Sequence, residues 1–232
     1  MRPYHVRHSI AYRRTIQGSV FGSSITKLLK ELFFALEMLN WTQIGNTPDE
    51  TQLFERVKSP MRIILGMTGA SGTAYGLRLL ELLLQGRHEV HLVMSPAWHQ
   101  SAAQEGFSPP QAKTRLVIYD PHDYNVPLAS GSAHFDGMVI APCSGSSLGC
   151  IASGINQHVI HRAAEVQLKE RRRLVMLFRE SPLSLVHIQN MERITLAGGI
   201  IQIAAPHFYT APQTIQEVID TVVERTMQLL KM

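Results

Sequence analysis

The sequence predicts an α/β fold in which a mainly parallel sheet lies between two layers of helices. Short runs rich in branched aliphatic residues alternate along residues 61–230 with longer stretches that repeat apolar residues at helical spacing. Runs of this kind are typical of parallel strands buried on both faces. Because strand and helix alternate throughout, the sheet must be covered by helices on both sides.

Each element follows from a local pattern. The first strand, 62–66, ends in glycine, and the helix after it, 74–84, has helical apolar spacing and ends before Gly86. The further strands are expected at 89–95, 116–119, 137–141, 173–178 and 199–203. The further helices are expected at 146–169 with a break near Gly154, at 184–197 and at 213–230.

The first sixty residues differ from this regular body. Residues 1–24 are basic and free of acids, residues 24–39 have helical apolar spacing, and residues 40–60 are polar with several turn formers. We therefore predict an N-terminal extension over 1–60 and one domain over 61–232. The extension is either an accessory or start-site segment, a docking segment or an organellar presequence. The expected location is the cytoplasm, or the mitochondrion if the presequence reading holds.

Composition excludes several classes of protein. A chain of 232 residues that is 45% hydrophobic can bury a sizeable core and is not wholly disordered. No run of eighteen apolar residues is present, so no membrane span is expected. Two cysteines cannot build a disulfide framework or a tetrahedral zinc site, and they suit a reducing compartment.

The net charge of +4 sits mainly in the extension. Residues 1–60 hold eight Lys and Arg against five Asp and Glu, whereas residues 61–232 hold fourteen against thirteen. The body is close to neutral, so a groove for nucleic acid is not expected.

Small hydroxyl and amide donors follow three of the expected strands. Gly66–Gly72 links the first strand to its helix, Ser95 ends the second strand, and Pro142–Ser147 follows a later one. In a parallel sheet these segments meet at one edge, where ligands bind. Glycines and free amides at helix starts suit a phosphate group, as in a mononucleotide or flavin, although a tight strand–helix turn alone would also explain Gly66–Gly72.

Other candidates carry weaker signals. Cys143 has no histidine near it in sequence and is interpreted as a packing residue rather than a nucleophile. His158 and His161 stand three apart on an expected helix, but no carboxylate lies close by, so no metal site is predicted.

Arg179 and Glu180 directly follow an apolar strand. This position favours an anion clamp beside a general acid or base. The polar stretch 162–173 before that strand is typical of a solvated helix end, with Glu165 and Lys169 as an i,i+4 pair.

Several motifs in register resemble the UbiX/Pad-type flavin prenyltransferases over about residues 61–230. They are Gly66–Gly72, Val93–Ser95, Ala129–Ser132, Asp136–Ser144, Arg162–Arg172, Arg179–Leu183 and Pro206–Tyr209. The resemblance implies a flavodoxin-like Rossmann fold and a homo-oligomer, a dodecamer built of trimers with sites at subunit interfaces. It also implies transfer of a dimethylallyl group from dimethylallyl phosphate to N5 and C6 of reduced FMN, without metal. The prenylated FMN would then serve a UbiD-type decarboxylase.

The resemblance also assigns residues. FMN would be held by Gly69, Ala70, Ser71, Ser95, Ser144, Gly145, Ser146, Ser147 and Arg162. The prenyl phosphate would be held by Lys169, Arg179, Tyr209 and Arg225. Glu180 would be the main acid or base, with Ser71 close by and Glu105 as the second carboxylate.

The chain departs from the family's pattern in places. His158–Ile160 replaces the usual Asn-Leu-Leu, Gly145 and Ser146 alter the FMN turn, and His207 replaces an alanine. Two alternatives therefore stay open: a flavin-binding relative that decarboxylates cysteine, and a non-catalytic FMN-binding or prenyl-FMN carrier protein. The first would need a catalytic histidine after the first glycine loop, and residues 75–84 contain none.

Overall fold

The computed structural model describes residues 60–231 and contains a six-stranded sheet in which every strand pair is parallel. The strand order is β3-β2-β1-β4-β5-β6. The strands are β1 (Arg62–Met67), β2 (Glu89–Met94), β3 (Leu116–Tyr119), β4 (Gly137–Cys143), β5 (Arg173–Phe178) and β6 (Ile200–Ile203). The predicted fold class is confirmed, while the helix expected over 24–39 lies outside the described residues.

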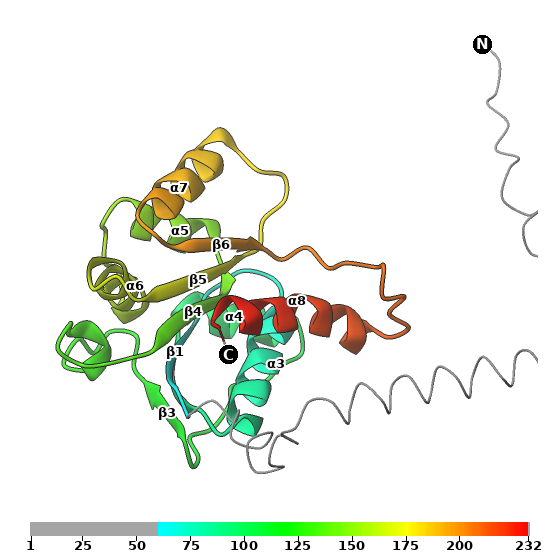
Figure 1. Cartoon of the computed structure of the whole chain (residues 1–232), viewed down its shortest axis with the longest axis horizontal. Helices are drawn as coiled ribbons and strands as arrows, with labels where there is room; N and C mark the ends of the chain where they lie inside the picture. The colour runs from blue at the N-terminus through cyan, green and yellow to red at the C-terminus, as the bar shows by residue number, and fades with distance from the viewer. Residues whose placement is uncertain (1–59, 232) are drawn as a thin grey trace, which may run out of the picture. The chain divides into compact units, whose positions relative to one another are not determined.

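Helices cover both faces of the sheet, as Figure 1 shows. They are α3 (Thr73–Gln85), α4 (Pro96–Gln104), α5 (Gly145–Ala152), α6 (Val159–Lys169), α7 (Leu185–Leu196) and α8 (Ile215–Leu229), with a 3-10 turn, η1, at Pro127–Ala129. One core contains side chains of α3, α4 and α8, and the other contains side chains of η1, α5, α6 and α7.

Alternation along the strands separates these two cores. Ile63 and Leu65 of β1 pack with the α3 side, whereas Ile64 between them packs with the α6 side. All of these side chains are fully buried. The sequence runs of branched aliphatic residues are therefore explained by burial on both faces.

The strand order reverses direction between β1 and β4. The chain moves outward from β1 through β2 to β3, and then from β4 through β5 to β6 on the other side. A crevice forms where such an order reverses, beyond the carboxyl ends of the two central strands. The loops after β1 and β4 therefore border the expected ligand site.

The helix prediction missed one element. The strand expected over 89–95 ends at Met94, and α4 begins directly after Ser95 with Pro96 in its first turn. Ser followed by Pro is a recognised helix start, but this helix is short and has few apolar residues. The expected break near Gly154 is confirmed, since α5 ends at Ala152 and α6 begins at Val159.

Gly76 allows α3 to lie directly against β4. A Cβ atom at this position would overlap the backbone carbonyl oxygen of Ala141, which belongs to a fully buried strand and has no room to move. The absence of a side chain at Gly76 thus sets the distance between this helix and the sheet.

We predict that Gly76→Ala lowers the free energy of unfolding by about 2 kcal/mol, because the added methyl group forces α3 away from the sheet. Urea unfolding monitored by circular dichroism measures this change. Gly149→Ala in α5 is the matched control, since its new Cβ atom has no neighbour closer than the Asn190 Nδ2 atom at 3.5 Å. It should leave stability unchanged or raise it by up to ~1 kcal/mol through helix propensity. Equal effects of the two substitutions would contradict the close approach.

Candidate functional site

A cavity of about 350 Å³ lies beyond the carboxyl ends of β1, β2 and β4. Its lining consists of Thr68, Gly69, Ser95, Pro96, Ala97, His122, Ser144, Ser146, Ser147, Gln157, His158 and His161. The lining includes five of the predicted FMN-binding residues and, among the residues that the structure describes, contains no Asp, Glu, Lys or Arg. Its polar character comes from hydroxyl groups, one amide side chain, backbone amides and imidazole rings.

Three helices begin at this cavity. The Ser95 hydroxyl accepts a hydrogen bond from the Trp98 amide at 3.2 Å and caps α4, and the Ser144 hydroxyl does the same for Ser147 in α5. The third helix, α6, begins directly after His158. Helix N-termini carry partial positive charge, and no carboxylate of the described part of the chain lines the cavity to oppose it. This arrangement suits an anionic group.

Thr68 ties together the two loops that border the crevice. Its hydroxyl donates to the Pro142 carbonyl oxygen at 2.9 Å and accepts from the Ser144 amide at 2.8 Å. The Thr68 amide also donates to the Pro142 oxygen at 3.1 Å. The loop after β1 and the loop after β4 are thereby fixed relative to each other, although Thr68 was not among the predicted site residues.

His161 lines the cavity and orients Ser147. The Gln157 amide donates to His161 Nδ1 at 3.3 Å, so the neutral ring carries its proton on Nε2. Nε2 then donates a hydrogen bond to the Ser147 hydroxyl oxygen, 3.2 Å away. Burial, with a smaller effect of His158, lowers the pKa of His161 to about 4. The ring is therefore neutral at pH 7.

The turn between β1 and α3 is held by Glu105. Its two carboxylate oxygens accept hydrogen bonds from the Gly72 and Thr73 amides, each at 2.8 Å. Burial alone raises the pKa of Glu105, but these bonds and one from Ser71 outweigh it and hold the pKa below its ordinary value. Glu105 thus caps α3 and positions Ser71, with Gly72 in the left-handed conformation at φ 104°.

Arg179 and Glu180 follow β5 at the same edge of the sheet. The Arg179 amide donates to the Cys143 carbonyl oxygen at 3.2 Å, and Glu180 Oε1 accepts from the Ser181 amide at 3.0 Å. Glu180 Oε2 lies 3.6 Å from the position of a Cβ atom on Gly145, in the turn before α5. The carboxylate therefore stands beside the turn whose other residues line the cavity.

Two further residues at this edge of the sheet, Cys143 and His187, bear on the sequence predictions. Cys143 is fully buried, and burial raises its pKa, which supports the packing interpretation. His187 was not predicted. It forms a capping box with Ser184, and its Nε2 atom lies 2.9 Å from the Cβ position of Gly145. The missing side chain of Gly145 thus makes room for the imidazole, which the sequence alone could not reveal.

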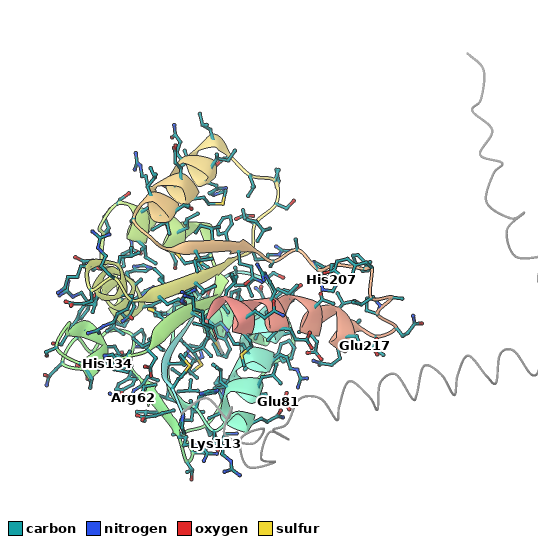
Figure 2. All side chains as sticks on the ribbon, viewed as in Figure 1. Arg62, Glu81, Lys113, His134, His207 and Glu217 are labelled. Carbon is teal, nitrogen blue, oxygen red and sulfur yellow. The ribbon has the colours of Figure 1, made fainter. Side chains whose placement is uncertain are left out.

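The four phosphate-binding candidates are not brought together within one chain. Arg179 follows β5, whereas Lys169 precedes it, and a six-residue strand spans roughly 20 Å. Tyr209 is 85% exposed on the segment between β6 and α8 that reaches out from the sheet in Figure 1. Its ring stacks on His207, labelled in Figure 2, at 4.0 Å between centroids. Arg225 is exposed on α8 and donates to Gln228 at 3.1 Å.

Arg162 also lies away from the cavity lining. Its guanidinium donates to the Ala129 carbonyl oxygen at 3.2 Å and to Glu165 at 2.9 Å. The Lys169 ammonium instead pairs with Glu170 at 2.5 Å. Glu165 and Lys169 therefore each have a nearer ionic partner, while Lys169 still contributes to lowering the pKa of Glu165.

Comparison with known proteins identifies the family. The model of the family described as Flavoprotein matches residues 52–227. Flavin prenyltransferase UbiX of Pseudomonas aeruginosa is 40% identical over 190 residues, which cover 75% of this chain and 91% of the relative.

Two solved structures are similar throughout the described domain. AnUbiX (PadA1), in complex with FMN and dimethylallyl pyrophosphate, has a TM-score of 0.72 and 38% identity, covering 75% of this chain and 93% of its own. A dodecameric FMN-dependent UbiX-like decarboxylase from Escherichia coli O157:H7 has a TM-score of 0.70 and 35% identity, covering 74% and 96%. By sequence and by structure, the chain belongs to the flavoproteins of the UbiX flavin prenyltransferase family.

Proposed function

We propose that this protein transfers a dimethylallyl group from dimethylallyl phosphate to reduced FMN and so makes prenylated FMN. The observation that carries the proposal is the position of Glu180 and Arg179. An acid or base and a cation stand at the same sheet edge as an uncharged cavity that suits the phosphate of a flavin nucleotide.

FMN fits this cavity by charge and by hydrogen bonding. Its phosphate would meet the N-termini of α4, α5 and α6 and the hydroxyls of the turn after β4. The proposed FMN-binding residues are Gly69, Ala70, Ser71, Ser95, Ser144, Gly145, Ser146, Ser147 and Arg162. When bound, the reduced flavin supplies N5 and C6, the positions that take the dimethylallyl group.

The chain's own residues would manage the charge of the departing phosphate. Arg179 forms no ion pair among residues 60–231, so its guanidinium is available to an anion. Positive charge at this point stabilises the leaving phosphate as the allylic C–O bond breaks. Glu180 would donate a proton to that phosphate or accept one from the acceptor. Glu105 would hold the turn that contains Ser71 rather than transfer a proton itself.

A second copy of the chain would complete the site. Arg162 and Lys169 are seven residues apart on α6 and therefore lie on one face of that helix. Presented by a neighbouring subunit, that face would bring Lys169 to the Arg179 of the first subunit.

Exposed apolar side chains also favour contact with another subunit. The large apolar side chains that are more than 60% exposed are Leu185, Val186, Leu196, Phe208 and Ile215. We propose a homo-oligomer, and specifically a dodecamer.

The finer biological assignments belong to the same proposal. The product would pass to a UbiD-type decarboxylase that uses prenylated FMN. None of the described helices is long and apolar enough to cross a membrane. Both cysteines are free, which supports a reducing compartment such as the cytoplasm.

We predict that Glu180→Gln lowers the rate of prenyl transfer by about 100-fold or more while FMN still binds, because the amide cannot exchange a proton. The enzyme is mixed with FMN, reductant and dimethylallyl monophosphate, and the change of the flavin absorbance spectrum over a single turnover gives the rate. Glu192→Gln on the exposed face of α7 is the matched control and should react like the wild type. Unchanged turnover in Glu180→Gln would exclude this catalytic role, and an FMN-loaded wild type without any product would favour the carrier alternative.

We predict that two inactive variants restore each other. Lys169→Ala and Glu180→Gln should each be inactive alone, but co-assembled in equal amounts they should reach about a quarter of wild-type activity. In a composite site a random quarter of the sites receives both native groups. If both groups came from one chain, no mixed site would hold the pair and activity would stay at background.

A further inference from the structure

A histidine pair forms one wall of the cavity at the start of α6. The rings of His158 and His161 are 3.8 Å apart between centroids, with an angle of 34° between their planes. Both residues line the cavity, and His158 is only 8% exposed. The resemblance assigned no role to either residue, and His158 stands where the family usually has asparagine.

The two rings differ in their hydrogen bonding. Both nitrogens of His161 have partners, Gln157 on one side and Ser147 on the other. His158 Nδ1 is buried and has no hydrogen-bond partner within the described domain. A buried polar nitrogen without a partner is costly, and a bound group that forms a hydrogen bond with the ring would offset this cost.

Within the described domain, no permanently charged side chain lines the cavity beside His158. The titratable groups that face it are His161 on its own helix and His122 from the loop after β3. Burial, and to a lesser extent His122, lowers the pKa of His158, so the ring is neutral before a ligand binds. An anion in the cavity would reverse this balance, because it stabilises the imidazolium.

We propose that His158 contacts the phosphate of FMN in this cavity and takes up one proton from solvent when FMN binds. The inference rests on the proposed function, since it specifies how the same cavity recognises its flavin. In the bound state the imidazolium donates a hydrogen bond to a phosphate oxygen, and Ser147, oriented by His161, contributes a second. The positive charge that side chains of this cavity otherwise lack is then created by binding itself.

The direction of the pH effect follows from linkage. The ligand raises the pKa of a group whose pKa is low in the free protein, so binding consumes a proton. FMN affinity must therefore be highest at low pH and must fall as pH rises through the pKa of the bound state. Between pH 6.5 and 8.5 the flavin phosphate itself is mainly a dianion, since its second pKa is about 6.

The test compares FMN with riboflavin, which lacks the phosphate, by fluorescence titration at pH 6.5, 7.5 and 8.5. We expect the wild type to bind FMN about 5- to 10-fold more weakly at pH 8.5 than at pH 6.5. His158→Asn should weaken FMN binding by about tenfold at pH 6.5, remove most of the pH dependence and leave riboflavin binding unchanged. His134→Asn is the matched control. Figure 2 shows His134 near Arg62, whose guanidinium donates a hydrogen bond to the His134 carbonyl oxygen. Arg62 begins β1, so both residues lie at the edge of the sheet opposite the cavity.

Proton uptake is measured directly by calorimetry in two buffers of different ionisation enthalpy at pH 7.5. The wild type should take up more protons per FMN than His158→Asn, and the contribution of the flavin phosphate cancels in this difference. Equal uptake, or an equal loss of affinity for FMN and riboflavin, would overturn the inference while leaving FMN binding intact. Failure of the assembled wild type to bind FMN at any pH would instead overturn the proposed function.

Discussion

The hydrogen bonds of Thr68 hold together the two loops on which the whole site depends. A parallel sheet brings all carboxyl ends to one edge, but it does not by itself fix how the loops beyond that edge lie. Thr68 joins the loop after β1 to the loop after β4 through both its amide and its hydroxyl. The starts of α3 and α5 are therefore positioned together, and the hydrogen bonds of Thr68 preorganise the cavity wall that contains Ser144 and Gly69. Such preorganisation lowers the cost of binding.

Local patterns were sufficient to predict most of the fold, because each strand is an apolar run bounded by turns and each long helix has a wide apolar face. The same reasoning placed Ser95 and Ser144 at or just after the ends of strands, on the ligand edge of the sheet. It failed for α4, whose short polar sequence gives little periodicity. It also could not foresee the roles of Glu105 and His187, since these depend on contacts with Gly72 and Gly145 that are distant in sequence.

The position of Lys169 is a different case, because the direction of β5 alone determines at which edge of the sheet this residue lies. Lys169 ends the helix that leads into β5, and Arg179 follows that strand, so the two must lie at opposite edges of any parallel sheet. A family resemblance that assigns both residues to one phosphate site therefore requires two copies of the chain. The exposed apolar side chains around α7 and before α8 agree with that requirement. Sequence order and resemblance together carry more information about assembly than either does alone.

The distribution of charge separates the proposed site for the flavin phosphate from the proposed acid–base and cation pair. Among residues 60–231, the cavity proposed to take the flavin phosphate is lined by neutral groups and helix N-termini, which attract an anion through partial charges. The charged residues Arg179 and Glu180 lie at the edge of the sheet where the cavity is. Lys169 of the same chain lies at the opposite edge of the sheet. A single chain can thus offer a flavin site while lacking the full set of cations that a departing phosphate needs. If assembly supplies them, the reactive allylic donor meets a competent site only where subunits exclude water from it, which protects the allylic cation from hydrolysis.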